Sequence, residues 1–320
     1  MKLSITENKT EYGLDYVEIR GCEEFNVAHI FECGQCFRWN FYKGINGFDM
    51  YLGVAGAKAA AVSAFRRNDE NVIVIANATL EDYESFWRAY FDFNRDYGEI
   101  CSTLSAKDEH LRRAVQFGGG IRILRQEIFE TLISFILSAN NNIPRIKGCV
   151  EKLCSDYGDV IVLSEAFRQY IKQNTGAEVE KMHAFPSAQQ LAGVTAAEYS
   201  ACCKAGYRCA YMEKTVECFI EKPDLLLTAS QDSATLRDAR DIAMSYCGVG
   251  PKVADCILLF TGLRTDVFPV DVWVRRVLCD LYFHRDVSRT EAERFAVEYF
   301  GSLAGFAQQY LFYFMREENK

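Results

Sequence analysis

The sequence predicts an α+β protein, in which a small antiparallel sheet domain with a flanking helix over residues 1–100 precedes a larger all-α domain over residues 101–320. Two patterns support this prediction. Apolar and polar side chains alternate in the first hundred residues, and apolar side chains recur at helical spacing afterwards. A chain of 320 residues is also long enough for two or three packed units.

Three segments of the first domain have the pattern of strands. Residues 37–41 place an aromatic side chain at every second position, residues 48–54 alternate in the same way, and residues 72–75 form a short β-branched run. A period of two with aromatic and β-branched residues is typical of half-buried strands.

Helices are predicted where apolar residues recur three or four positions apart. The flanking helix spans about 80–90, and Thr79 can cap it. Another spans 128–136 and ends at the asparagine run 140–142, after which Pro144 suits the start of the next helix. Later helices are expected over 146–154, 188–203, 210–220, 235–247, 251–262, 272–283, 290–300 and 303–315.

Composition restricts the cellular setting. The chain is 49% hydrophobic and 25% charged, and no apolar run approaches the roughly 20 residues of a membrane span. Its N-terminus lacks the apolar core of a signal peptide. We therefore expect an intracellular protein, in the cytoplasm with the nucleoid if bacterial and in the nucleus if eukaryotic. The net charge of −8 disfavours non-specific nucleic-acid binding but does not exclude a shaped site.

The thirteen cysteines indicate free thiols, because their number is odd and no export signal precedes them. Cys33 and Cys36 have the spacing of zinc ligands, but no second such pair occurs and the four histidines are dispersed. No cysteine follows Cys279, which excludes a four-cysteine iron–sulfur cluster near the C-terminus. No metal is therefore expected among the side chains.

A glycine corner is the most informative segment. Gly248 and Gly250 bracket Val249 between two helical patterns, and Pro251 fits the first position of the second helix. The unpaired N–H groups of that helix can bind a phosphate without reading a base. Gly-Val-Gly-Pro alone is equally compatible with an ordinary corner between helices.

Lys252 and Asp271 add candidate chemistry to this corner. An ammonium group is unfavourable at a helix N-terminus, and the same repulsion favours the neutral amine, which is the nucleophilic form. Asp271 follows Pro269 and precedes a helix, so it is a good N-cap. Facing Lys252, it would also stabilise an oxocarbenium ion or handle the lysine proton. A solvated lysine and a merely capping aspartate are the structural alternatives.

Five motifs occur in the order in which one enzyme family has them. They are residues 32–39, 135–145, 206–208, the hairpin through Asp271, and 304–308 followed by Phe312. Through them the sequence resembles the helix-hairpin-helix DNA glycosylases with a Gly/Pro-rich loop and a catalytic aspartate, and among these the 8-oxoguanine DNA glycosylase/AP lyases. The resemblance covers most of the chain and places the helix-hairpin-helix at about 235–262.

The resemblance implies a base-excision DNA repair enzyme. Such an enzyme flips 8-oxoguanine out of double-stranded DNA, preferably opposite cytosine, excises it through a lysine Schiff base and nicks the strand by β-elimination. It implies a monomer with no required cofactor and no membrane. Two alternatives are a glycosylase for another damaged purine, such as an alkylated base, and a non-catalytic helix-hairpin-helix DNA-binding module.

The resemblance also implies roles around the damaged base. Lys252 would attack the sugar C1′ and Asp271 would assist it. Gly34 would offer its carbonyl to the N–H at ring position 7, which guanine lacks. Because a duplex base must be everted before its sugar bond can be attacked, a pocket is needed. Its further members would be Cys256 and Phe312, which sandwich the base, and Gln308, which binds its Watson–Crick edge.

The opposite strand would be contacted by a second group. The resemblance implies that Asn140, Arg145 and Arg208 contact the cytosine left behind, while Tyr207 wedges into the emptied stack. One departure is Trp273, at a position where many relatives have a phosphate-binding histidine. The family also has a monovalent cation on hairpin carbonyls, here those of Met244, Tyr246 and Val249. Considered one at a time, most of these residues are equally compatible with a purely structural role in a core, a loop or a strand bend.

Overall fold

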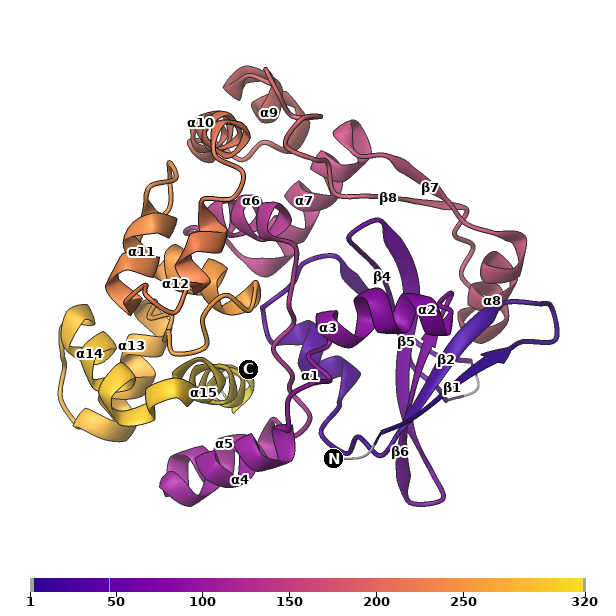
Figure 1. The fold of residues 1–320 in the computed structure, drawn as a ribbon, viewed down its shortest axis with the longest axis horizontal. Coiled ribbons are helices and arrows are strands. Elements are labelled where there is room, and N and C mark those ends of the chain that lie inside the picture. Colours follow the sequence, from indigo (N-terminus) through magenta and orange to yellow (C-terminus); the bar gives the residue numbers. More distant parts are fainter. Residues whose placement is uncertain (1–2, 46, 319–320) are drawn as a thin grey trace.

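The computed structural model describes residues 3–45 and 47–318, with a sheet on one side and helices on the other (Figure 1). The predicted α+β class is confirmed. Six strands are hydrogen-bonded in the order β1-β2-β6-β5-β4-β3, and all neighbours are antiparallel. Their bounds are β1 Ser4–Lys9, β2 Asp15–Arg20, β3 Trp39–Tyr42, β4 Met50–Ala55, β5 Lys58–Arg67 and β6 Glu70–Ala76.

Three strands, β3, β4 and β6, overlap the three segments that the alternation predicts. The others were not predicted from the sequence. The buried stretch of β5 begins with three alanines and a valine, and all of 59–63 is buried. A strand covered on both faces has no alternation to detect. The turn from β5 to β6 has Asn68 and Asp69 at positive φ, as a tight two-residue hairpin requires.

The flanking helix predicted over 80–90 is confirmed as one continuous element. It consists of α2 (Leu80–Asp82), a π turn and α3 (Arg88–Tyr90), and Thr79 and Asp82 form a reciprocal capping box. Together with α1 (Val27–Glu32) it covers one face of the sheet, where aromatic rings such as Phe31 and Trp87 pack in the core.

The helical half wraps around α12 and α15 (Figure 1). Most of its helices lie where apolar spacing predicts them, but α4 and α5 were not predicted. Its main helices are α4 Tyr97–Lys107, α5 Glu109–Phe117, α6 Ile128–Ser138, α7 Ile143–Tyr157, α9 Ala196–Cys203, α10 Arg208–Glu221, α11 Leu236–Met244, α12 Pro251–Phe260, α13 Val272–Leu278, α14 Arg289–Phe300 and α15 Ala304–Glu318.

The helix expected over 188–203 is wrong in its first half. Residues 188–193 form turns, and α9 begins only at Ala196. Gly193 has a φ of +76°, which an α-helix does not allow, and Thr195 forms a capping box with Glu198. The apolar spacing continues through this boundary, but the local capping chemistry sets the start of the helix.

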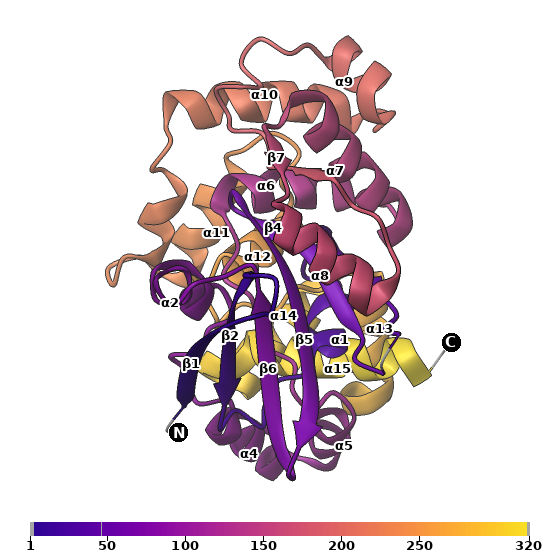
Figure 2. The ribbon, with the colours of Figure 1, turned by 90° about the vertical axis from the view of Figure 1, so that its right-hand side faces the viewer.

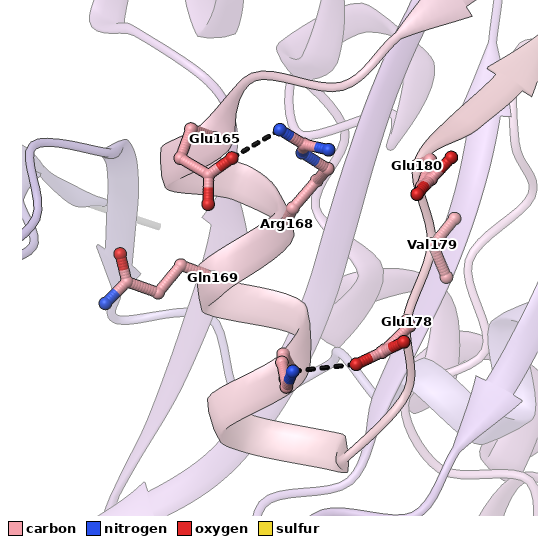
Figure 3. A pocket seen from close by; sticks show the side chains of 7 residues that line it. Glu165, Arg168, Gln169, Glu178, Val179 and Glu180 are labelled. Carbon is pink, nitrogen blue, oxygen red and sulfur yellow. Dashed lines mark hydrogen bonds and ion pairs between the residues drawn. The ribbon is translucent and has the colours of Figure 1, made fainter.

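In one respect the second half is not all-α. Strands β7 (Val160–Val162) and β8 (Lys181–His183) pair and bracket α8 (Glu165–Thr175). The segment formed by β7, α8 and β8 places α8 across the second face of the sheet (Figure 2). There Phe167 and Ile171 pack into a core shared with the sheet. A groove between α8 and residues 178–180 is lined mostly by charged side chains, which form two ion pairs (Figure 3).

The cysteines are dispersed in the core. All thirteen are free thiols, and Cys33 and Cys36, whose spacing suggests zinc, lie in two different apolar clusters. Among the residues that the structure describes, no group of histidine, cysteine and acidic side chains is arranged to hold a metal ion. In the same ranges no helix has the length and apolar character needed to cross a bilayer.

Candidate active site

The glycine corner joins α11 to α12 as a tight hairpin. Gly248 has a φ of +83°, and a Cβ there would stand 2.5 Å from a ring carbon of Tyr211, so both its backbone and its neighbour require glycine. Gly250 is the N-cap of α12, and a Cβ there would point into open space. Pro251 occupies the first helical turn as expected. The open side of Gly250 is therefore where another backbone can approach closely.

Lys252 lies on the first turn of α12, half-buried. Its Nζ is 5.6 Å from the centroid of the Phe135 ring. The thiol of Cys256 lies near this amine, one helical turn further on. Burial raises the pKa of that thiol to about 11, although the nearby amine opposes the rise. Cys256 is thus a neutral, soft contact behind the lysine.

Asp271 is the N-cap of α13. Its Oδ1 accepts the Val274 N–H at 2.7 Å, and its backbone is extended. The capping that its position predicts is therefore present. The carboxylate is held at the helix start and lines the same cavity as Lys252. One side chain can thus cap a helix and still offer a negative charge to the cavity.

A cavity of about 500 Å³ brings together residues from five separate segments of the chain. Five of the predicted residues line it: Gly34, Asn140, Lys252, Asp271 and Phe312. The remaining lining residues are Phe37, Phe135, Ser138, Ala139, Asn141, Ile143, Ile146, Val272 and Trp273. The aromatic and aliphatic walls suit a flat apolar ligand, with an amine and a carboxylate at one side.

The walls predicted for a flat base are partly formed. Gly34 has a φ of +85°, and a Cβ there would meet the Phe312 ring at 3.6 Å, so the Gly34 backbone packs against this ring. Cys256 and Gln308 are both buried and do not line the cavity. The Gln308 side-chain oxygen accepts from the Gln309 amide at 2.6 Å. These two lie behind the wall, within the helices that form it.

The opposite-strand group surrounds the loop between α6 and α7. Asn140 has a φ of +50° and lines the cavity. Arg208 is only 5% exposed, and its guanidinium donates to the carbonyls of Ala139, Asn140 and Ala205. In this structure Arg208 therefore supports the loop from beneath.

Two members of the same group face solvent. Tyr207 is 54% exposed, and its hydroxyl is 3.4 Å from the Ala139 carbonyl. Arg145 is exposed on the first turn of α7 and donates to the Lys204 carbonyl at 3.2 Å. Tyr207 therefore lies beside the Asn140 loop, and Arg145 reaches toward the loop that precedes Tyr207.

Sequence reasoning missed several apolar cavity residues. Phe37 was assigned to a strand and Phe135 to a helix, yet their rings meet edge to face at 5.5 Å in the cavity wall. No local signal separates such a side chain from a core residue, because both are apolar and sit at regular spacing. Trp273, the departure from the family pattern, is half-buried in the same wall.

A helix-hairpin-helix beside a cavity that contains a lysine and a carboxylate is the architecture of a DNA glycosylase. Residues 133–301 match the family model of HhH-GPD superfamily base excision DNA repair proteins, and residues 19–132 match the N-terminal domain of 8-oxoguanine DNA glycosylase. The chain belongs to the HhH-GPD superfamily of base excision DNA repair proteins. The resemblance inferred from the five motifs is confirmed.

Individual relatives agree with this assignment. An N-glycosylase/DNA lyase of Saccharomyces cerevisiae is 30% identical over 268 residues, which are 79% of this chain and 67% of the yeast protein. The structure of Clostridium acetobutylicum 8-oxoguanine glycosylase/lyase bound to DNA with cytosine opposite 8-oxoguanine is 38% identical, with a TM-score of 0.84 and 99% of both chains covered. MBOgg1 bound to a low-affinity DNA ligand is also 38% identical, with a TM-score of 0.85 and full coverage of both chains.

Proposed function

We propose that this chain is a bifunctional 8-oxoguanine DNA N-glycosylase/AP lyase of base excision repair. It binds duplex DNA through the hairpin, everts the damaged base into the cavity and excises it. The observation that most supports this function is the common cavity of Lys252, Asp271, Gly34 and Phe312 beside the helix-hairpin-helix. The similarity to 8-oxoguanine glycosylases over the whole chain supports the same substrate.

Lys252 is the proposed nucleophile. Its Nζ bonds to C1′ of the deoxyribose while the bond from C1′ to N9 of the base breaks. The bonding electrons leave with the base, which takes up a proton, and the amine loses one. Ring opening gives a protonated imine between Lys252 and the sugar. Removal of a C2′ proton then expels the 3′ phosphate, which is the β-elimination of an AP lyase.

Asp271 is the proposed electrostatic partner. Positive charge develops on the sugar as the glycosidic bond breaks, and a fixed carboxylate stabilises it. Because the Val274 N–H already orients this carboxylate, little reorganisation is needed during the reaction. The same carboxylate can take the proton that the lysine amine releases.

Recognition of the lesion is assigned to Gly34 and the walls around it. Its carbonyl would accept the N–H at position 7 of 8-oxoguanine. Guanine has no hydrogen there, so a buried acceptor would be left unpaired, and such sites discriminate by about 10⁴–10⁵. Phe312 and Cys256 would enclose the ring faces. Gln308 would bind the Watson–Crick edge once the base has entered.

The opposite cytosine is assigned to the edge formed by Asn140, Arg145, Tyr207 and Arg208. Their contacts join residues 139–140, between α6 and α7, to residues 204–205, between α9 and α10, so two neighbouring loops would present them together. Tyr207 has the exposure that a wedge needs, and Arg145 can donate to base acceptors. Trp273 would offer an indole N–H to a phosphate where relatives have histidine.

The remaining assignments concern the hairpin and the setting. Hairpin phosphate contacts would come from the N–H groups around Gly248, Val249 and Gly250. The carbonyls of Met244, Tyr246 and Val249 would hold a monovalent cation, because carbonyl oxygens are hard neutral ligands and these lie at and after the negative end of α11. We propose a monomer that acts where the cell keeps its DNA, the nucleoid of a bacterium or the nucleus of a eukaryote.

The test is cleavage of an 8-oxoguanine:cytosine duplex beside the three mispairs, with and without alkali. We expect release of free base, strand nicking without alkali, fastest reaction opposite cytosine, and a covalent adduct after borohydride reduction. The Lys252→Gln variant should bind the duplex but form no adduct, because an amide is not a nucleophile.

The outcomes distinguish the alternatives. Adduct formation by Lys252→Gln equal to that of wild type would show that another group is the nucleophile. Faster release of an alkylated purine than of 8-oxoguanine would favour a different glycosylase. Binding without any base release after long incubation would indicate a non-catalytic module.

A further inference from the structure

A side chain outside the catalytic and base-contacting set connects two walls of the cavity. Arg316 lies on α15, four residues after Phe312 and eight after Gln308, so all three share one helix face. Its guanidinium carbon lies 5.5 Å from the centroid of the Phe312 ring. The residue proposed to stack on the base therefore has a cation against its ring.

The same guanidinium reaches the turn that presents Gly34. Its Nη2 donates to the carbonyl of Glu32, the last residue of α1. Its Nη1 would be 3.7 Å from a Cβ on Gly34. A cation at the C-terminal end of α1 is favourable, because the carbonyls there form the negative end of the helix dipole. Arg316 thus joins α15 to the start of the Gly34 turn.

The guanidinium is largely enclosed and incompletely paired. Its side chain is 18% exposed, and its Nε donates to Glu317 at 3.0 Å. Its Nη1 is buried and has no acceptor among the described residues. An unpaired buried donor is unfavourable, and a native structure retains one for a reason such as function. Packing against Phe312 and Gly34 supplies that reason.

We propose that Arg316 is a positioning residue for base recognition. It holds the stacking ring of Phe312 and the carbonyl of Gly34 at a fixed separation, so that a purine fits between the two walls. This inference rests on the proposed function, because it assigns the cavity to an everted base. It predicts that Arg316 affects base excision and leaves cleavage of a preformed abasic site unaffected, since no base then occupies the cavity.

The test compares Arg316→Met with the wild-type chain in two single-turnover assays. Release of 8-oxoguanine from an 8-oxoguanine:cytosine duplex should slow about tenfold, as expected for loss of one cation–π contact and one charge-assisted hydrogen bond. Nicking of a duplex with a preformed abasic site should stay within about twofold of wild type, because Lys252 is untouched. Arg316→Lys should recover part of the lost rate, since it keeps the charge over Phe312.

A matched control packs against the same helix. Arg113 of α5 has its guanidinium carbon 5.3 Å from the Phe314 ring and pairs with Glu318 at 3.3 Å, so it also clamps α15, but its partners are not Phe312 and the Gly34 turn. Arg113→Met should leave both rates unchanged. If Arg316→Met does not fold, the Arg316→Lys variant provides the test, with slower base release and normal nicking as the expected result.

Other results would overturn the inference. Unchanged base release in Arg316→Met, or an equal fall in base release and abasic-site nicking, would show that Arg316 has no specific role in base positioning. Both results require a wild-type chain that releases 8-oxoguanine, so they leave the proposed function intact. A wild-type chain that releases no base would overturn the proposed function and this inference together.

Discussion

Single residues around the cavity combine structural and chemical tasks. Asp271 caps α13 while its charge faces the cavity, and Lys252 packs over Phe135 while its amine stays beside Cys256. Gly34 combines a left-handed backbone with close contact to Phe312. In each case the structural contact fixes the orientation of the group that the chemistry uses, which is how a site is preorganised.

Gly34 can be tested by adding one methyl group. We expect Gly34→Ala to lose about 1 kcal/mol of stability, because an L-residue is strained at a φ of +85°. We also expect base release to fall at least about tenfold, because the methyl group points toward Phe312 and crowds the pocket. Urea unfolding and single-turnover excision measure the two effects.

Gly13 provides the control for this prediction. It has a nearly identical φ of +86°, but a Cβ there would meet nothing within 4 Å. Gly13→Ala should therefore lose similar stability and keep normal excision. Equal activity of the two variants would contradict the placement of Gly34 in the base pocket.

At the scale of elements, the two glycines of the hairpin between α11 and α12 have different roles. Gly248 is required by the fold, because Tyr211 on α10 packs against it. Thr215, on the same helix, donates to the Cys247 carbonyl and fixes the hairpin from the same side. Gly250 faces open space and has an ordinary φ of −93°. The first glycine serves packing, and the second leaves room for DNA.

The two glycines should therefore respond differently to alanine. Gly248→Ala should lose more than about 2 kcal/mol of stability, because backbone strain adds to a clash with Tyr211. Gly250→Ala should lose about 1 kcal/mol or less, since alanine is only a poorer N-cap. It should nonetheless weaken duplex binding, because its methyl group occupies the approach to the α12 N–H groups. Thermal unfolding and fluorescence anisotropy distinguish these effects, and tight DNA binding by Gly250→Ala would contradict the phosphate assignment.

At the scale of the whole molecule, the cavity depends on how the two halves meet. The turn with Gly34 belongs to the sheet half, and the neighbouring Gln35 is tied to residues 122–126 by several hydrogen bonds. Nearby, Arg38 donates to the His183 carbonyl of β8 and lies 3.8 Å from Glu130 of α6. Buried polar contacts therefore fix the sheet against the helices on two sides of the cavity.

The Glu130 carboxyl should make this junction sensitive to pH. Burial raises its pKa from 4.5 to about 7, although the Arg38 guanidinium opposes the rise. Between these values the folded state binds a proton that the unfolded chain releases, so the free energy of unfolding falls as pH rises through this window. The free energy of unfolding of Glu130→Gln, relative to that of wild type, should therefore rise by up to about 3 kcal/mol between pH 5 and pH 7.5.

Urea unfolding of both proteins at the two pH values measures this difference. Parallel pH profiles for wild type and Glu130→Gln would show that this carboxyl titrates in its ordinary range.

Much of the fold follows from local pattern. The strands β3, β4 and β6 and most of the long helices have amphipathic periodicity, and Thr79 and Pro251 mark helix starts by capping chemistry alone. The alanine-rich β5 escapes such reasoning because both of its faces are covered. The place of α8 could not be predicted from local pattern either, because it depends on the apolar face of a sheet formed about a hundred residues earlier.

The sequence by itself determined the α+β class, the glycine corner with its lysine and aspartate, and the family, because each depends on residue types at short, fixed spacings. Only the tertiary structure decided which of those residues share a cavity. It placed Gly34 against Phe312 and Arg316, and it buried Arg208 beneath a loop instead of in the open. Contacts between residues far apart in the chain are set by the packing of whole elements, and no local pattern encodes them.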